Sequence, residues 1–280
     1  MGRDDTVRPC ARLGASIGAG AATRPQGRMS VARERLSTAA RRAAGGAAGV
    51  GARLRAVGFA RRRRRLSKRY LLGSGLEIGA LHRPLAVARG VKVTYVDRMD
   101  VAGLRAHYPE LGDAQLVHVD AIDNGEALAG QRDASADFVI ANHFLEHSED
   151  PIGTIESHLR VIRPGGVLYL AVPDRRRTFD SDREPTPLDH VIRDHREGPA
   201  WSRTLHQREW AELVEKVPPG ELEDRVRWLE EHDYSIHFHV WGREDFRALL
   251  EHARDVQGLP FTLEELVQND HEFIAILRRT

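Results

Sequence analysis

Residues 137–147 read Asp-Phe-Val-Ile-Ala-Asn-His-Phe-Leu-Glu-His, and the turn Arg163-Pro164-Gly165-Gly166 follows at the distance of one helix. Phe138–Ala141 is a short apolar run that predicts a buried strand, and the segment from Pro151 to Ile162 predicts a helix. The glycine turn then leads into a second strand, Val167–Val172. A strand, a helix and a strand in this order indicate a right-handed unit of a parallel sheet.

Upstream of this unit, strands and helices alternate in the same way. The sequence predicts strands at Leu76–Ile78, Val91–Val96 and Gln115–Val119, with a helix at Val101–His107. These strands end at Gly79, Asp97 and Asp120. The pattern favours an α/β, Rossmann-like, doubly wound fold.

Downstream, residues 174–233 interrupt this alternation. They are polar, with helical stretches at Gln207–Lys216 and Glu221–Glu231, and we interpret them as a helical insertion over the carboxyl edge of the sheet. A helix at Glu244–His252 and two strands, Phe261–Val267 and Glu272–Leu277, follow. Asn269-Asp270 supplies a turn that predicts an antiparallel hairpin.

The first 69 residues differ in composition from residues 70–280, which we expect to form the folded domain. Residues 1–70 hold 18 Lys and Arg against 3 Asp and Glu, whereas residues 71–280 hold 24 against 38. Few apolar side chains offset the entropy of ordering this arm, so it is expected to be disordered or partly helical, and Met29 is an alternative start. The run Arg61, Arg62, Arg63, Arg64 and Arg65 predicts a solvated basic linker or a contact with an anionic surface.

Few signals point to a particular compartment. Cys10 is the single cysteine, so no intrachain disulfide can form. The sequence contains no apolar run of about 18 residues that predicts a transmembrane helix, and no apolar stretch typical of a secretory signal. A cytoplasmic location is the expectation that follows.

The residues at the strand ends are the candidate functional residues, because ligands of such sheets bind at the carboxyl edge. Gly79 allows the backbone to pass close to a ligand. Asp97, 18 residues later, can accept hydrogen bonds from two ribose hydroxyls. Asp120 can accept from an adenine amino group, with Ala121 leaving room for the ring.

The ordered set of motifs resembles the class I S-adenosylmethionine-dependent methyltransferases, in particular their type 11 subgroup. The matching segments are residues 76–79, 95–97, 119–121, 137–147 and 159–168. The resemblance implies a mostly parallel seven-stranded sheet with an antiparallel last strand, and S-adenosyl-L-methionine as cofactor. It implies these cofactor contacts: Glu77, Gly79, Ala80, Asp97, Arg98, Asp120, Ala121, Asn142 and His143. Unlike most relatives, the first turn has one glycine, since it continues Ala80-Leu81-His82-Arg83.

Histidines supply the candidate bases and metal ligands. His143 is the first candidate for a catalytic base, and His237 or His239 is the next. His237 and His239 lie two residues apart, on one face of an extended segment, as in a metal site. No cysteine cluster or nearby carboxylate completes a ligand set in the sequence, so we expect no metal.

Together these features predict transfer of a methyl group to an oxygen or nitrogen of a small-molecule or sugar-containing acceptor. One alternative is a nicotinamide-dependent oxidoreductase, which normally has G-x-G-x-x-G in the first turn. Another is a non-enzymatic module that binds an anionic surface or nucleic acid through the basic arm; no obligate nucleic-acid partner is expected.

Overall fold

A computed structural model describes residues 47–280, with side chains from Ala56 onward except that of Glu110. Most of the predicted basic arm, including Cys10 and Met29, lies outside these residues. Arg53–Thr280 forms one compact unit. The sequence places the domain boundary at 69/70, which falls at the end of the first described helix, α2 (Ala47–Tyr70).

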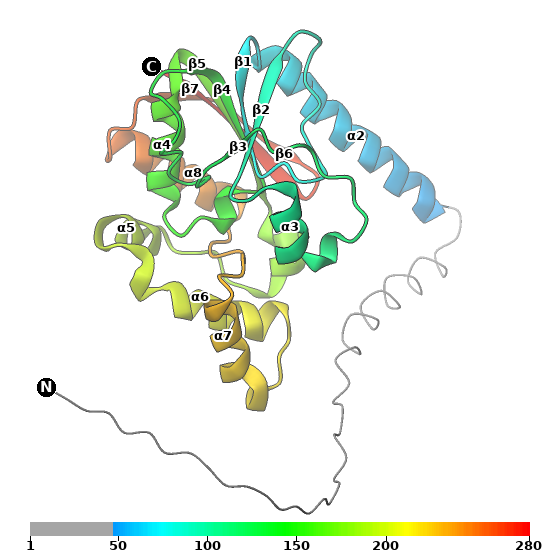
Figure 1. Cartoon of the computed structure of the whole chain (residues 1–280), viewed down its shortest axis with the longest axis vertical. Helices are drawn as coiled ribbons and strands as arrows, with labels where there is room; N and C mark the ends of the chain where they lie inside the picture. The colour runs from blue at the N-terminus through cyan, green and yellow to red at the C-terminus, as the bar shows by residue number, and fades with distance from the viewer. Residues whose placement is uncertain (1–46) are drawn as a thin grey trace, which may run out of the picture. The chain divides into compact units, whose positions relative to one another are not determined.

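The core of this unit is a seven-stranded sheet (Figure 1) with the strand order β3-β2-β1-β4-β5-β7-β6. The strands are β1 (Ser74–Ile78), β2 (Lys92–Asp97), β3 (Ala121–Ile122), β4 (Ala136–Asn142), β5 (Ile162–Pro173), β6 (Phe261–Asn269) and β7 (Glu272–Arg279). β7 pairs antiparallel with both β5 and β6, and all other pairings in the sheet are parallel. The predicted fold class, with its antiparallel last strand, is therefore confirmed.

Helices pack against both faces of the sheet, which explains why β4 and β5 are almost continuously apolar. On one face, alternate residues such as Val139 and Leu168 pack against α4 (Pro151–Val161) and α8 (Arg243–Asp255). On the other face, Phe138 and Tyr169 pack against the end of α2. The remaining helices are α3 (Val101–His107), α5 (Leu188–Glu197), α6 (Arg203–Glu209) and α7 (Leu222–Glu231).

Helix α2 replaces the solvated linker that the sequence predicts. Leu66 is buried against the sheet, and Ser67 Oγ donates a hydrogen bond to the Ala86 carbonyl at 2.7 Å. Arg63 turns inward and pairs with Glu272 of β7, with Nη2 and Oε2 2.5 Å apart. This arginine is therefore committed within the domain, whereas its neighbours Arg61, Arg62, Arg64 and Arg65 are exposed.

Two local predictions differ from the structure. The predicted strand Gln115–Val119 is irregular, and β3 consists of the next residues, Ala121–Ile122, which pair with Val96 and Asp97. Residues 163–166 interrupt β5 rather than precede it, because Ile162 already pairs with Ala136. Gly165 takes the left-handed backbone, at φ +80°, that this detour requires.

The insertion follows β5 and contains α5, α6 and α7. It has a small apolar cluster of its own around Ala211, Val226, Leu229, Ile236 and Phe238. Downstream, the predicted hairpin is present: Asn269 of β6 pairs with Glu272 of β7 across a turn at Asp270. Among the described helices, none is long and apolar enough to cross a membrane.

Candidate active site

A cleft of about 720 Å³ opens at the carboxyl edge of β1, β2, β3 and β4, beneath the extended segment that follows α7. This volume lies within the range of small-molecule sites. The sheet side contributes Ile78, Gly79, Leu81, Asp97, Arg98, Ile122, Asp123, Asn124, Gly125, Glu126, His143, Phe144, His147 and Glu149. Residues of α3, the following turn and the insertion close the other side: Tyr108, Leu111, Arg203, Asp233, Tyr234, Ser235 and Phe238.

The first turn reaches the cleft with a single glycine. Gly79 has φ +60°, and its amide donates to the Val96 carbonyl at 3.0 Å. A Cβ added at Gly79 would meet only Phe144, at 3.6 Å. Leu81 takes a left-handed backbone at φ +48° and lines the cleft. Ala80 lies between them, partly exposed but outside the cleft lining.

Glu77 lies beneath this turn, buried in β1. Its Oε1 accepts a hydrogen bond from the Leu85 amide at 2.8 Å and a longer one from Asn142 Nδ2 at 3.5 Å. Burial raises the pKa of Glu77 to about 7, although these hydrogen bonds and the charge of Arg63 lower it. Glu77 Oε2 and Asn142 Oδ1 have no hydrogen-bond partner within the described part of the chain. Glu77 and Asn142 do not line the cleft themselves; they lie behind the lining residues and can orient them.

Asp97 and Arg98, at the end of β2, both line the cleft. Asp97 Oδ1 accepts the Arg98 amide at 2.8 Å, and burial raises the pKa of the Asp97 carboxyl. Arg98 Nη2 pairs with Asp233 Oδ2 of the insertion at 3.1 Å. The sheet and the insertion are thus joined by an ion pair between two lining residues.

Asp120 and Ala121 do not line the cleft, contrary to the expected adenine contact. Asp120 Oδ2 accepts the Tyr95 amide at 2.9 Å, because the chain reaches β3 later than predicted. Asp123, just beyond β3, lies in the cleft instead. Its carboxylate accepts the amides of Asn124 and Gly130 and so shapes the loop after β3.

His143 lies in the cleft at the end of β4, with a left-handed backbone of φ +52°. Its Nε2 is 2.8 Å from Glu272 Oε2 and its Nδ1 is 3.4 Å from Glu146 Oε1. Burial lowers the pKa of His143, but these two carboxylates outweigh it and raise the pKa to about 9. With this pKa, His143 is protonated at neutral pH and has no free lone pair to act as a general base, so we do not assign it that role.

His147 is a cleft residue that the sequence analysis did not single out as a base. Its Nδ1 is 2.8 Å from the Ile236 carbonyl, which can only accept, so Nδ1 carries the proton and Nε2 holds a lone pair. Burial, with the nearby His237, lowers the pKa of His147 to about 4. The cleft thus combines a protonated His143 with a neutral His147.

His237 and His239, the other predicted bases, do not line the cleft. His237 Nδ1 is 2.8 Å from Asp180 Oδ2. His239 is fully buried, and its Nε2 is 3.3 Å from the Glu149 carbonyl. Burial lowers the pKa of His239 to about 4. The two side chains therefore serve different polar clusters rather than one shared pair.

Known proteins that are similar to this chain include methyltransferases. The chain is 34% identical over 140 residues to a probable S-adenosylmethionine-dependent methyltransferase of Mycolicibacterium smegmatis, covering 50% of this chain and 47% of the relative. It is 33% identical over 110 residues to a ubiquinone biosynthesis O-methyltransferase of Nitrosomonas europaea, covering 39% and 46%. The chain thus spans about half the length of the curated relatives it matches.

A solved structure of a putative S-adenosylmethionine-dependent methyltransferase from Methanococcus maripaludis is also similar. It is 13% identical, with a TM-score of 0.42, over 93% of this chain and 98% of that one. The sequence profile of the methyltransferase domain matches residues 50–253, which is most of the chain. The chain therefore belongs to the methyltransferase-domain family, whose cofactor is S-adenosyl-L-methionine.

Proposed function

We propose that this protein transfers the methyl group of S-adenosylmethionine to an acceptor oxygen or nitrogen in the cleft. The observation that carries the proposal is the convergence of Gly79, Asp97 and His147 on one cleft at the carboxyl edge of the sheet. That edge is where open α/β sheets bind their ligands. The bound cofactor supplies an electrophilic methyl group; orientation and proton transfer belong to the protein.

The residues present fit such a cofactor. The open space over Gly79 admits a ligand close to the backbone, and the Asp97 carboxylate offers an acceptor for ribose hydroxyls. At position 125, in the cleft lining, only glycine fits without a shift, since a Cβ there would come within 2.7 Å of Phe144 and Ile78. We assign Gly79, Asp97 and the loop from Asp123 to Gly125 to cofactor binding, with Glu77 and Asn142 supporting the turn from behind.

A hydroxyl is the acceptor group that suits this cleft best. A hydroxyl must lose its proton during transfer, and a neutral imidazole can receive it. His147 is neutral at physiological pH and is held in one tautomer by the Ile236 carbonyl. The relative from Nitrosomonas europaea is named as an O-methyltransferase, which supports oxygen as the acceptor atom. We assign His147 as the base.

The acceptor itself is expected to be a polar small molecule or a sugar-containing compound. Charged side chains line the insertion side of the cleft, among them Arg203, which pairs with Glu149 at 2.8 Å. Positioning an acceptor between these groups and the methyl donor can lower the activation free energy by about 7–11 kcal/mol. The comparisons do not favour the nicotinamide-dependent alternative or a module acting through the arm alone.

The first test is thermal unfolding of the full chain with S-adenosylhomocysteine and, separately, with NADH. Ligand at about 100 times its dissociation constant stabilises the folded state by about 2.7 kcal/mol. A shift with S-adenosylhomocysteine alone supports the proposal, and a shift with NADH alone contradicts it. Asp97→Ala is expected to weaken binding about 10- to 100-fold, since a hydrogen bond to a charged group contributes about 1.5–3 kcal/mol.

Asp100→Ala is the matched control. Its carboxylate lies three residues away but caps α3 by accepting the Gly103 amide at 2.7 Å, and it does not line the cleft. We expect this variant to lose about 1 kcal/mol of stability while keeping its affinity for S-adenosylhomocysteine. Equal affinity of Asp97→Ala and wild type would remove Asp97 from the cofactor site. Methyl transfer is then measured with labelled cofactor and matched hydroxyl and amine acceptors.

A further inference from the structure

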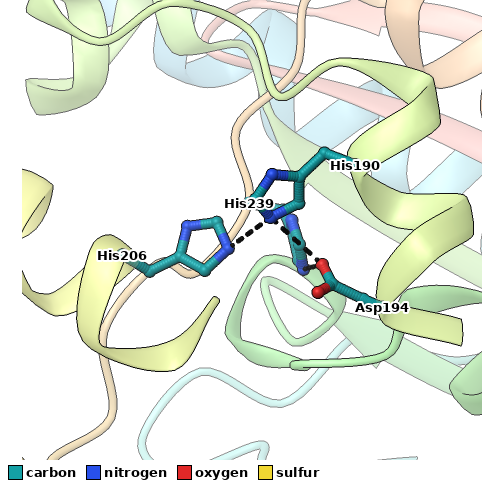
Figure 2. A group of neighbouring side chains, drawn as sticks. All are labelled: His190, Asp194, His206 and His239. Atoms are coloured by element: carbon teal, nitrogen blue, oxygen red, sulfur yellow. Dashed lines mark hydrogen bonds and ion pairs between the residues drawn. The ribbon is translucent and has the colours of Figure 1, made fainter. Parts of the chain in front are cut away.

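Four side chains meet where the insertion packs against the extended segment before α8, outside the cleft lining. Figure 2 shows His190 and Asp194, both from α5, with His206 from α6 and His239 from the extended segment before α8. We refer to these four residues as the histidine cluster. They are separated by up to 49 positions in the sequence, and three of them are buried. The insertion and the segment after it thus bring three imidazoles and one carboxylate together at a single point.

The separations within the histidine cluster match those of ligands around one small cation. His190 Nε2 is 3.0 Å from His206 Nε2 and 3.2 Å from Asp194 Oδ2, and His239 Nε2 is 3.7 Å from Asp194 Oδ2. One ligand atom from each residue lies within 4.8 Å of all the others. A tetrahedral zinc ion with bonds of about 2.0–2.1 Å holds its ligand atoms about 3.3 Å apart.

The protein alone leaves this cluster incompletely satisfied. The Asp194 side chain is 0% exposed, and its Oδ2 has no hydrogen-bond partner among the described residues. His239 Nδ1 is likewise buried without a partner in the described chain. A buried carboxylate oxygen without a donor or counter-charge is unfavourable. His190 Nε2 carries at most one proton and faces both His206 and Asp194, so His190 cannot satisfy both partners at once.

The carboxylate is nevertheless held in a fixed orientation. Asp194 Oδ1 accepts a hydrogen bond from Ser202 Oγ at 2.6 Å, which leaves Oδ2 directed toward the three imidazoles. Outer hydrogen bonds of this kind orient metal ligands and tune their affinity. The His239 ring also stacks on Trp241, with centroids 5.7 Å apart. Asp194 and His239 are therefore oriented by their surroundings before any ion binds.

We propose that the histidine cluster is a structural zinc site with His190, Asp194, His206 and His239 as ligands. Three imidazole nitrogens and one carboxylate oxygen suit zinc, whereas calcium and magnesium prefer all-oxygen sets. Four protein ligands complete a tetrahedral shell and leave no position for a substrate, so the ion stabilises the fold rather than activating the acceptor. This proposal reverses the expectation from sequence that no metal is bound.

The zinc ion would stabilise one wall of the cleft. The cluster joins α5, α6 and the segment containing Phe238, which lines the cleft next to His239. Arg203, another lining residue, lies one turn before His206 on α6. The Glu149 carbonyl, from a residue on the sheet side of the cleft, lies 3.3 Å from His239 Nε2, and zinc would displace the proton that this nitrogen donates to it. Loss of zinc is therefore expected to loosen the insertion rather than the sheet.

The first test uses the full wild-type chain purified without a histidine tag. Metal analysis by mass spectrometry is expected to find about one zinc ion per chain. After the zinc is removed with a chelator, adding zinc is expected to raise the unfolding temperature, and adding cobalt(II) is expected to give the strong visible bands of a tetrahedral site. A wild-type chain that takes up no zinc after incubation with zinc chloride overturns the proposal. Stoichiometric iron or copper in its place overturns the choice of zinc.

Variants then assign the ligands. Asp194→Ala and His206→Ala are each expected to lose the stoichiometric zinc and the cobalt bands. His232→Ala is the matched control, since His232 lies in the same insertion but is exposed and contacts the Trp228 carbonyl. Full zinc content in both ligand variants contradicts the assignment. The wild-type measurements require no substitution, so they decide the question even where a ligand variant does not fold.

Ser202→Ala gives a graded readout. It keeps all four ligands and removes the hydrogen bonds of Ser202 Oγ to Asp194 Oδ1 and to the Pro199 carbonyl, of which only the first contacts a ligand, so we expect zinc to bind about 10- to 100-fold more weakly. Competition with a chromogenic chelator measures this change. Unaltered zinc affinity in Ser202→Ala would show that Asp194 is not oriented as a ligand, and would count against the site. None of these measurements depends on methyl transfer, so the zinc site and the proposed function can fail separately.

Discussion

Glu272→Gln tests the buried ion-pair network that joins α2, the sheet and the cleft. Glu272 is fully buried and accepts hydrogen bonds from Arg63 Nε at 2.8 Å, Arg63 Nη2 at 2.5 Å and Asn269 Nδ2 at 2.7 Å. His143 Nε2 lies a further 2.8 Å from Oε2. The substitution keeps the shape of the side chain and removes its charge, so Arg63 loses its buried counter-charge and His143 retains only Glu146.

The pKa of Glu272 gives the expected magnitude. Burial raises this pKa, but the hydrogen bonds and charges of Arg63 and His143 outweigh it and lower the pKa from 4.5 to about 2. At about 1.4 kcal/mol for each pH unit, this difference corresponds to about 3 kcal/mol of stability. Removing one partner of a buried pair typically costs about 3–5 kcal/mol, which agrees. We therefore expect the free energy of unfolding at pH 7 to fall by about 3 kcal/mol.

Urea unfolding of wild type and variant measures this difference. Because the folded pKa is lowered, the contribution of Glu272 is present above pH 4.5 and is lost as the pH falls toward 2, so the two proteins should converge in acid. In the variant, the pKa of His143 should also fall from about 9 toward its ordinary value, which an NMR titration follows.

Glu264→Gln is the control, because Glu264 forms a partly exposed pair with Arg278 on the same hairpin. A loss of about 0–1 kcal/mol is expected there. A loss below about 1 kcal/mol in Glu272→Gln, or an equal loss in the control, would refute the reasoning.

Further substitutions test the cleft and the insertion. His147→Gln is expected to lower methyl transfer to a hydroxyl about 10²- to 10⁴-fold with unchanged S-adenosylhomocysteine affinity, and the wild-type rate should not lose this base until the pH approaches 4; an unchanged rate would exclude the base. Gly125→Ala brings a Cβ within 2.7 Å of an aromatic ring, so thermal unfolding should show about 1–3 kcal/mol of destabilisation. Gly58→Ala, whose Cβ meets no atom within 4 Å, should instead stabilise its helix by about 0.5–1 kcal/mol. Arg98→Ala removes a largely exposed pair with Asp233, so stability should change by about 0–1 kcal/mol while limited proteolysis of the insertion quickens; protection equal to wild type would count against this link.

The strands that carry the fold could be predicted because their signals are local. Phe138–Ala141 and Val167–Val172 are apolar on both faces, and Asp97 directly ends its strand, as predicted. β3 could not be placed, because Gln115–Val119 alternates like a strand while only Ala121–Ile122 pairs with β2. That shift exchanged Asp120 for Asp123 in the cleft.

The histidines could not be sorted from the sequence, because their partners are distant in the chain. Glu272, 129 residues away in the sequence, helps to keep His143 protonated. A carbonyl 89 residues away fixes His147 in one tautomer. His237 and His239 alternate like a ligand pair, yet their carboxylate partners are Asp180 and Asp194, respectively. The residue types predicted which edge of the sheet carries polar side chains. The protonation state of each histidine depends on neighbours that are distant in the sequence and come close only in the folded chain.

The inward position of the Arg63 side chain limits how far the chain can be shortened from its N-terminus for expression. Charge composition suggests starting a shortened protein at residue 70, after the arginine run. Such a product would carry the buried Glu272 carboxylate without the guanidinium that α2 delivers to it. A shortened protein that begins at Arg53, the first residue of the compact unit, keeps that guanidinium in place. The segment that looks most dispensable on paper thus holds a side chain that stabilises the opposite end of the chain.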